Sequence, residues 1–413
     1  MKALVFMTDP EPVDPPPPDA PKLVQHLATT PMKIEDVPDP IVKADDWMVL
    51  KTRLTGICGS DSKQVLMDFD DAADNPMTAF ITFPQVLGHE VVAEVVETGA
   101  AIGSVAGDVA VGQRVVLNPW LSCGPRGIDP PCPECEAGNY SACWRFLDGR
   151  LAPGIHTGNS SDATGGFAEY LPAHRLMAFP VPDDVSDEVA VLADPFSVSL
   201  HAITRNPPPP GGRVVVYGAG ALGSTSVAIL RALYPDVEVA AIARWPAQVA
   251  LAERLGATVF APEPREQLIE DLASWCGAVL RHPWEGLPVA YPSHIDVVYD
   301  TVGYPATVEV GLRVLAHGGT LVQMGVSSPA RFEWTPWYFK ELKLIGSNAF
   351  GVETVDGVHR HAIEHYLDLV RAGRIDLTGM LTHEFRLAQW RDAFTTIIEQ
   401  ETTGAIKVAF DFR

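Results

Sequence analysis

The 413-residue chain carries 30 basic and 52 acidic side chains, which gives a formal net charge of −22. Nucleic acids and anionic membranes are bound through basic faces, so this balance argues against both as partners. With 47% hydrophobic and 20% charged residues the composition is typical of a globular enzyme, and the length predicts two to three domains of about 150 residues each.

The first 180 residues read as short strands separated by proline and glycine. Val86–Glu97 and Gly112–Leu117 are rich in valine and predict strands. Pro10–Pro21 is rich in proline and acid and predicts an exposed insertion, and Asp68–Asn75 predicts a second acidic loop. No apolar run reaches the ~20 residues of a membrane helix, and no signal peptide is predicted. Clustered cysteines at metal spacing, without an export signal, favour a reducing compartment, so we expect a cytoplasmic protein.

Two segments of this first part combine side chains that bind zinc. Cys58 lies in GICGSD, and His89 and Glu90 lie in the later segment GHE. A catalytic zinc takes about three ligands from cysteine, histidine and carboxylate and leaves one position open. Asp194, in LADPF, is the candidate third ligand, with Glu90 as a fourth. A lone cysteine or histidine more often packs in a core, but the joint pattern predicts a metal site.

Two polar residues follow Cys58 directly. Asp61 would accept a hydrogen bond from the far nitrogen of His89, which fixes the tautomer of the ring and raises its basicity. Ser60 would pass on the proton of the substrate's hydroxyl. The alternative for each residue is to cap the start of a helix.

A second group of cysteines crowds one loop and predicts a structural zinc site. The four are Cys123, Cys132, Cys135 and Cys143. Two candidates compete for the fourth ligand position, Cys123 and Asp129. Closed structural sites prefer thiolates, so we expect Cys123, with Gly124–Pro131 looped out. Disulfide pairing is the alternative, which a reducing cytoplasm disfavours.

Beyond residue 181 short apolar strands alternate with helices, which is typical of a doubly wound parallel sheet. The predicted strands are Arg213–Tyr217, Val237–Ala243, Thr258–Phe260, Asp296–Asp300 and Thr320–Met324. The predicted helices are Gly223–Tyr234, Ala247–Leu255, Asp356–Arg371 and Leu387–Gln400. Pro262–His294 predicts a helix and a surface insertion, and a final strand, Gly404–Phe410, is expected to return to the first domain.

A glycine-rich turn joins the first of these strands to its helix. Gly218, Gly220 and Gly223 form G-x-G-x-x-G, with Leu222 inside the motif, in the strand-to-helix context that a dinucleotide site requires. The glycines let the backbone approach a pyrophosphate at the positive N-terminus of the helix.

The end of the next strand indicates which dinucleotide binds. An acid there would bind the ribose 2′-hydroxyl of NAD, but this strand ends in Ala243 and Arg244, and Glu238 lies at its beginning. A guanidinium can bind the 2′-phosphate of NADP as a fork. We therefore expect NADP, with NAD as the alternative if Arg244 is only a solvated surface residue.

With these residues assembled, the chain resembles the zinc-containing medium-chain dehydrogenase/reductase family of alcohol, polyol and threonine dehydrogenases. The similarity extends over nearly the whole length, from MKALV at residue 1 to GAIKV at residues 404–408. GHEVVAEVVETG at residues 88–99 is close to the family's zinc signature, and GGFAEY at residues 165–170 and DPFSVSLHA at residues 194–202 also match.

The resemblance implies a GroES-like β-rich catalytic domain, residues 1–180 and 345–413, around a Rossmann domain, residues 181–344. It implies that substrate and nicotinamide meet at zinc between the two. Ser60 matches the relay hydroxyl, and Glu90 the glutamate that can approach the metal. The residues that match the catalytic zinc ligands are Cys58, His89 and Asp194, and those that match the structural lobe are Cys123, Cys132, Cys135 and Cys143.

We therefore expect a zinc-dependent oxidoreductase that transfers a hydride between an alcohol or polyol, or the matching carbonyl, and NADP(H) or NAD(H). Members of this family form dimers and tetramers, so the resemblance implies a homodimer or homotetramer. An aldehyde- or formaldehyde-processing relative and a non-catalytic, zinc-stabilised paralogue are the alternatives. The candidates to wall a substrate pocket are Trp120, Phe69, Phe80 and Phe83, although aromatic residues in loops more often pack in satellite cores.

Overall fold

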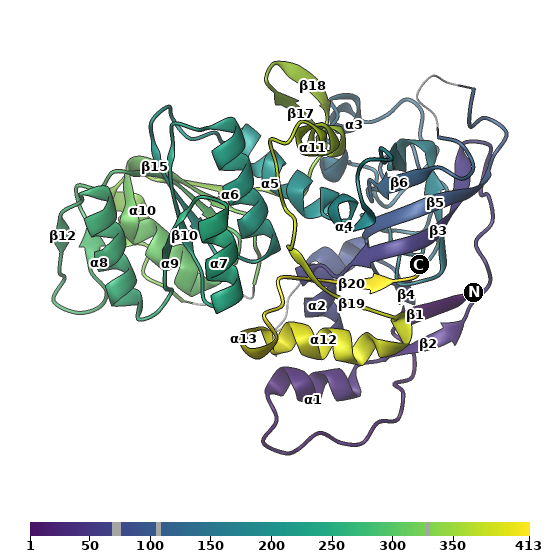
Figure 1. Ribbon diagram of the computed structural model, residues 1–413, viewed down its shortest axis with the longest axis horizontal. Coiled ribbons are helices and arrows are strands. Elements are labelled where there is room, and N and C mark those ends of the chain that lie inside the picture. The colour runs from purple at the N-terminus through teal and green to yellow at the C-terminus, as the bar shows by residue number, and fades with distance from the viewer. Residues whose placement is uncertain (68–75, 105–108, 328–330) are drawn as a thin grey trace.

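The computed structural model describes residues 1–67, 76–104, 109–327 and 331–413. The chain folds into two halves, each built on one large sheet (Figure 1). Both ends of the chain lie in the half that holds the mostly antiparallel sheet, so the chain leaves that half and later returns to it (Figure 1). The acidic loop predicted over Asp68–Asn75 lies outside the described residues.

The first half is centred on a seven-stranded sheet in the order β19-β20-β3-β5-β6-β8, with β7 also paired to β3. Its strands are β3 (Trp47–Gly56), β5 (Glu90–Thr98), β6 (Arg114–Leu117), β7 (Tyr170–His174), β8 (Ala178–Pro180), β19 (Leu381–Phe385) and β20 (Lys407–Asp411). A smaller sheet has the order β2-β1-β4, with β1 (Lys2–Phe6), β2 (Met32–Asp36) and β4 (Gln85–Val86). Strand β20 pairs antiparallel with β3, which brings the last residues of the chain beside Gly56.

The second half is a six-stranded parallel sheet in the order β11-β10-β9-β14-β15-β16. Its strands are β9 (Arg213–Tyr217), β10 (Glu238–Ile242), β11 (Thr258–Phe260), β14 (Ile295–Asp300), β15 (Leu315–Gln323) and β16 (Lys343–Gly346). Numbered by position in the chain, this is the order 3-2-1-4-5-6, in which a ligand binds where the first and fourth strands diverge.

Helices cover both faces of the parallel sheet (Figure 1). They are α6 (Ala221–Leu233), α7 (Pro246–Arg254), α8 (Arg265–Cys276), α9 (Pro305–Val314) and α10 (Thr335–Phe339). Because side chains alternate along a strand, Val214 and Val216 of β9 pack with α6 and α7, whereas Val215 and Tyr217 pack with α8 and α9. The short hairpin of β12 (Leu280–Arg281) and β13 (Val289–Ala290) forms the predicted surface insertion.

Helix α5 lies between the two halves and packs against α6 and α11. Helix α1, which the sequence analysis did not predict, packs against α12 (Figure 1). The remaining helices are α1 (Lys22–Thr29), α2 (Gly59–Val65), α3 (Pro133–Glu136), α4 (Asp187–Ala190), α5 (Ala193–Arg205), α11 (Ala362–Arg371), α12 (Trp390–Ile398) and α13 (Gln400–Thr403). Over the described ranges, no helix is both long and apolar enough to cross a bilayer.

Two predicted elements are corrected by the structure. The strand predicted over Val86–Glu97 is interrupted because Gly88 adopts φ +90° and turns the chain between β4 and β5. The helix predicted over Asp356–Arg371 begins only at Ala362. The residues before it form a hairpin of β17 (Val352–Val355) and β18 (Val358–His361). Its two turn residues, 356 and 357, both have positive φ, which is typical of a tight hairpin turn.

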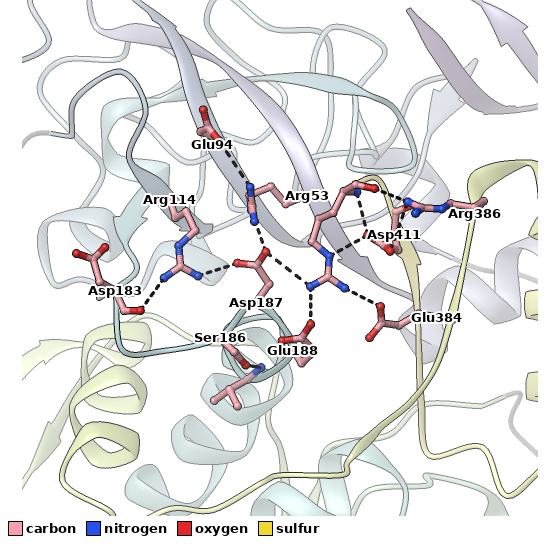
Figure 2. Close-up of polar contacts among 12 residues, drawn as sticks. Arg53, Glu94, Arg114, Asp183, Ser186, Asp187, Glu188, Glu384, Arg386 and Asp411 are labelled. Carbon is pink, nitrogen blue, oxygen red and sulfur yellow. Dashed lines mark hydrogen bonds and ion pairs between the residues drawn. The ribbon is translucent and has the colours of Figure 1, made fainter.

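An ion-pair network fastens α4 to the seven-stranded sheet (Figure 2). Asp187, the first residue of α4, is buried and accepts hydrogen bonds at 2.8 Å from Nε of Arg53 and from Nη1 of Arg114. The last residue of the chain, Arg413, pairs with the neighbouring Glu188. Since charge-assisted hydrogen bonds to a buried carboxylate are strong, the network holds the segment that leads into α5.

Candidate functional site

Three predicted site residues meet where β3 ends and β5 begins, in the middle of the seven-stranded sheet. Cys58 follows β3, His89 lies in the turn before β5, and Glu90 is the first residue of β5. One ligand atom from each of the three lies within 4.8 Å of the other two. The register of the sheet explains this, because Gly56 at the end of β3 pairs with Glu90.

Asp61 supports both Cys58 and His89. Its Oδ2 accepts a hydrogen bond from the backbone N–H of Cys58 at 3.0 Å, and its Oδ1 lies 3.6 Å from Nδ1 of His89. Burial lowers the pKa of His89, but the Asp61 carboxylate and the Cys58 thiol together raise it well above its usual value. With Nδ1 turned toward Asp61, Nε2 of His89 is left to bind a metal.

Asp194 lies in the first turn of α5, close enough to His89 and Glu90 for their charges to act on its pKa. It is buried, its Oδ2 has no hydrogen-bond partner among the described residues, and burial raises its pKa to about 7. An unpaired buried carboxylate is costly, so a cation beside it would be stabilising. In the described parts of the chain, however, its carboxylate is not within the Cys58–His89–Glu90 group. Its role as a zinc ligand stays a prediction.

Lys407 is a site residue that the sequence analysis missed. It begins β20, forms a buried ion pair with Glu90 and donates a hydrogen bond to the carbonyl of Ile57 at 3.0 Å. Gly56 leaves the space for this pair, because a Cβ there would meet Glu90 and lie 2.8 Å from Cε of Lys407. No motif marks Lys407, since only the pairing of β20 with β3 brings it here.

Ser60 and Lys63 lie on α2, beyond Cys58. Ser60 is exposed. Lys63 reaches the parallel-sheet half, where Nζ contacts the carbonyl of Val326 and lies 5.8 Å from the ring centroid of Tyr304. Helix α2 therefore faces the second half of the molecule, on the side where the glycine turn lies.

A second histidine that the sequence analysis did not identify packs on His89. The ring centroids of His156 and His89 are 4.6 Å apart, and Trp120 lies edge-on to His156 at 5.9 Å. Burial, with a contribution from His89, lowers the pKa of His156 to about 3, so the ring is neutral. Of the other predicted pocket residues, Phe80 and Phe83 are exposed, and the predicted Phe69 lies outside the described residues.

The four cysteines of the loop also come together. One sulfur from each lies within 4.8 Å of the others. Sγ of Cys143 is 3.7 Å from that of Cys123 and 4.0 Å from that of Cys132. A tetrahedral zinc with bonds of about 2.3 Å places its sulfurs about 3.8 Å apart, so the spacing fits such an ion. Hydrogen bonds, first of all from Cys135, lower the pKa of Cys143 to about 6, which favours the thiolate that binds metal.

The long loop between Cys123 and Cys132 is anchored by the fully buried Arg126. Its guanidinium donates five hydrogen bonds of 2.7 to 3.2 Å to backbone carbonyls. The acceptors are Leu121, Asp148, Leu151, Ala152 and Gly154. Asp129, the competing candidate, is not within the cysteine group among the residues described.

The glycine turn lies between β9 and α6, and its three glycines serve different purposes. Gly218 has φ +93°, and a Cβ there would lie 2.6 Å from Val302. A Cβ on Gly223 would collide with the carbonyl of Gly218, whereas one on Gly220 would meet no atom within 4 Å. The second glycine thus faces the open space that a pyrophosphate needs, and Leu222 lies in the first turn of α6.

Ala243 and Arg244 follow the carboxyl end of β10, the parallel neighbour of β9, so they lie at the same edge as Gly218. Ala243 is buried and Arg244 is exposed. Glu238 lies at the opposite end of β10 and pairs with Arg213 at 3.2 Å. The exposed charged side chain at the glycine-turn end of β10 is therefore that of Arg244, which is basic, and not that of Glu238.

Comparison with known proteins decides the family. The alcohol dehydrogenase GroES-like domain matches residues 44–183, which include Cys58, His89 and the four clustered cysteines, and the zinc-binding dehydrogenase domain matches residues 221–371. This chain belongs to the zinc-dependent medium-chain dehydrogenase/reductase family. The two halves of this dehydrogenase are the GroES-like and Rossmann folds that the sequence predicts.

The alignments with named relatives and with solved structures extend over most of the dehydrogenase. It is 25% identical to sorbitol dehydrogenase of Bacillus subtilis over 379 residues, 90% of this chain and 92% of the relative. It is 29% identical to L-threonine 3-dehydrogenase of Paraburkholderia xenovorans, covering 91% and 95%. A zinc-binding dehydrogenase from Sinorhizobium meliloti, solved bound to NADP, is 27% identical with a TM-score of 0.67, covering 92% and 95%.

A further structure, 2R,3R-butanediol dehydrogenase from Bacillus subtilis, is 21% identical with a TM-score of 0.72 and covers 100% of this chain and 99% of its own, which shows the shared fold. The predicted class of activity is confirmed. The chain is a zinc-dependent oxidoreductase of the alcohol dehydrogenase type that uses a nicotinamide cofactor.

Proposed function

We propose that this dehydrogenase oxidises an alcohol or polyol, or reduces the matching carbonyl, at a zinc ion bound by Cys58, His89 and Asp194. The observation that carries the proposal is the grouping of Cys58, His89 and Glu90 within 4.8 Å, beside the unpartnered carboxylate of Asp194. A thiolate, an imidazole and a carboxylate form a typical donor set for an open catalytic zinc. The relatives named for sorbitol and L-threonine support a hydroxyl-rich substrate.

The protein's own residues have separate tasks in this reaction. When bound, zinc supplies a Lewis acid for the substrate's oxygen and the nicotinamide supplies the hydride acceptor. Asp61 orients His89 through Nδ1. Ser60, exposed beyond Cys58, passes the hydroxyl proton toward solvent, and Glu90 is held close to the metal position by Lys407.

We also propose that the four clustered cysteines hold a structural zinc. Cys123, Cys132, Cys135 and Cys143 offer four sulfurs and no open position, as closed structural sites do. Removing a thiolate from this cluster would cost stability and leave the chemistry at Cys58 untouched.

The preferred cofactor of the proposed reaction is NADP, with NAD as the alternative. Gly218, Gly220, Leu222 and Gly223 would hold the pyrophosphate, and Ala243 and Arg244 would face the adenosine ribose. Arg244 is exposed at the edge where the 2′-phosphate would lie, and a guanidinium suits that group. The relative from Sinorhizobium meliloti was solved bound to NADP.

The test combines turnover with a zinc count. Reduction of NADP+ and of NAD+ is measured against alcohols, polyols, sugars and aldehydes, and zinc is counted by atomic emission. We expect both zinc sites to be filled, alcohol or polyol turnover, and loss of NADP+ preference in Arg244→Ala but not in the control Arg254→Ala. Preference for NAD+ in the wild type would reject the role of Arg244. Oxidation of aldehydes alone would support the aldehyde-processing alternative.

A second copy of the chain is the proposed protein partner, in a homodimer or homotetramer. Strand β16 is the edge of the parallel sheet, and the preceding helix α10 exposes Trp337, Tyr338 and Phe339. An unpaired strand edge beside exposed apolar side chains is a typical surface for self-association. Light scattering is expected to give a multiple of the 44.6 kDa chain mass, and a monomer would reject this part of the proposal.

The domain limits and the cellular compartment complete the proposal. The catalytic domain would comprise residues 1–180 and 345–413, and the dinucleotide domain residues 181–344, with β16 extending the parallel sheet to Gly346. All six cysteines are free thiols, which suits a reducing cytoplasm. Limited proteolysis that cuts near these limits and fractionation of the source cells would test the two statements.

A further inference from the structure

Lys63 belongs to the first half of the molecule, but its side chain ends on the parallel-sheet half. The residue lies on α2 and is half-buried. Its Nζ donates a hydrogen bond to the carbonyl of Val326 and lies 5.8 Å from the ring centroid of Tyr304. An ammonium at this distance from an aromatic ring is attracted by the ring's quadrupole. One side chain therefore makes two favourable contacts between the two halves.

Both contacts lie at the carboxyl edge of the parallel sheet. The last residue of β14, Asp300, pairs with Tyr217 at the end of β9 and with Gln323 at the end of β15. In a sheet of this strand order, each three-stranded half binds one mononucleotide of a dinucleotide. With the adenosine end proposed beside Arg244, after β10, the nicotinamide end lies over β14 and β15. This is the end that Lys63 contacts.

The two loops that follow β14 and β15 are fixed to each other. The buried carboxylate of Asp300 accepts hydrogen bonds from the N–H of Val302 at 3.0 Å and from that of Gly303 at 2.9 Å. Oγ of Ser327 donates to the carbonyl of Gly303 at 2.8 Å. The backbones also approach closely, because a Cβ on Gly303 would lie 2.0 Å from the carbonyl oxygen of Gly325. Lys63 therefore binds a surface whose two loops are held together.

The helix that carries Lys63 begins directly after Cys58, a proposed zinc ligand. The N–H of Ser62 donates to the carbonyl of Cys58 at 3.0 Å, and the N–H of Cys58 donates to the carboxylate of Asp61 at 3.0 Å. Val65 is buried and packs the helix against its own half. Lys63 is five residues beyond Cys58, which is about 7.5 Å along a helix axis. A short, anchored helix thus connects the proposed metal position to the nicotinamide end of the sheet.

From this arrangement we propose that Lys63 is a positioning residue, which fixes helix α2 and the proposed metal position relative to the nicotinamide. Hydride transfer requires the two reacting atoms to lie about 3–3.5 Å apart, and a misplacement of about 1 Å can lower the rate 100-fold. One half of the molecule would hold the substrate and the other the nicotinamide, so a contact between the halves sets this distance. The inference rests on the proposed function and deepens it, because it names a residue that aligns the two reactants.

The first test is the variant Lys63→Met, which keeps an unbranched side chain but removes the ammonium. With the best alcohol of the substrate panel, we expect kcat to fall by about 10- to 100-fold. A substrate deuterated at the reacting carbon should show a full primary isotope effect in the variant, because hydride transfer becomes the slow step. Zinc content and melting temperature should stay at their wild-type values. Lys63→Arg can donate to the same carbonyl and should restore most of kcat, and the exposed Lys51→Met is the matched control, which should change nothing.

Three results of this test would overturn the inference. The first is an unchanged kcat in Lys63→Met. The second is a shifted pH profile of kcat with a small isotope effect, which would make Lys63 a carrier of the proton that Ser60 passes on. The third is loss of zinc together with activity, which would give Lys63 a structural role at the metal position.

A second measurement needs no substrate. Dissociation of NADPH and of NADH is followed by stopped-flow fluorescence. We expect it to be about 10-fold faster in Lys63→Met, because the halves then separate without breaking a charge-assisted hydrogen bond. An unchanged dissociation rate would overturn the inference even if no alcohol were oxidised. Absent turnover in the wild type, with the faster dissociation retained in the variant, would reject the proposed substrate class alone.

Discussion

Lys407 and Glu90 form a buried ion pair that ties the last strand of the chain to the residue after His89. The carboxylate is placed by β5 and the ammonium by β20, and both strands meet at Gly56 of β3. The C-terminal strand therefore completes the electrostatic surroundings of the proposed metal position, and this relationship leads to a first prediction.

Replacing Lys407 by methionine should leave the Glu90 carboxylate buried without a partner. Removal of one member of a buried ion pair costs about 3–5 kcal/mol, whereas replacement of both members is often near neutral. We expect Lys407→Met to lower the free energy of unfolding by that amount and Lys407→Met/Glu90→Gln to recover most of it, measured by urea denaturation. Equal losses in the single and double variants would contradict a coupled pair.

Variants of Cys123 and Asp129 would show which of these two residues is the fourth ligand of the proposed structural zinc. Cys123→Ser should remove one zinc per chain and lower the melting temperature, because a structural zinc contributes directly to folding free energy. Asp129→Asn should keep both zinc ions and the wild-type melting temperature. The measurement is atomic emission together with thermal denaturation, and the reverse pattern would make Asp129 the ligand.

Alanine variants of Gly220 and Gly223 would separate the two roles of glycine in the cofactor turn. A Cβ at Gly223 collides with the carbonyl of Gly218, whereas one at Gly220 meets only open space. Gly223→Ala should therefore destabilise the fold, and Gly220→Ala should fold normally but bind cofactor more weakly, because the methyl group occupies the path of the pyrophosphate. Circular dichroism and fluorescence titration with NADPH distinguish the two effects.

Glu353 offers a pH-dependent test of the contact between α5 and β17. Burial raises the pKa of Glu353, but hydrogen bonds from His201, Thr204 and Arg205 outweigh it and hold the pKa below its usual value. A carboxyl of this kind stabilises the fold above its unfolded pKa of about 4.3, and the contribution disappears as the pH falls through the folded value.

Glu353→Gln should therefore lower the free energy of unfolding by about 1.5–3 kcal/mol at neutral pH, the range for hydrogen bonds to charged groups. The difference from the wild type should shrink as the pH falls below about 4. Urea denaturation across this pH range checks both statements. A constant difference at all pH values would mean that packing, not charge, is lost.

Arg126 carries the last prediction. Its guanidinium donates one hydrogen bond to the carbonyl of Leu121 and four to carbonyls of the segment that leads to His156. In Arg126→Met these buried carbonyls lose their partners, at a cost of about 1–3 kcal/mol for each that stays unsatisfied. We expect a markedly lower melting temperature in thermal denaturation, whereas the exposed Arg150→Met in the same loop should leave the melting temperature unchanged.

Local patterns in the sequence were sufficient to predict the elements and motifs that depend on residues close together along the chain. Strand β9 has the bounds that its apolar run predicts, and the glycine turn opens α6 where the motif places it. The cysteine spacing predicted a four-sulfur cluster because a short loop limits how far its thiols can separate. The alternation of strands and helices likewise predicted the parallel sheet.

Other features were decided by the tertiary structure alone, because they depend on pairings between distant segments. Lys407 reaches Glu90 only through the β20–β3 register, and His156 reaches His89 only because Arg126 and the bridge to Trp120 hold its loop there. Neither residue has a neighbour in the sequence that would reveal its role. The sequence by itself therefore determined the family of the enzyme and its class of cofactor, and predicted the zinc ligands. The folded chain decided what surrounds these residues, since a buried charge acquires its function from the groups packed against it.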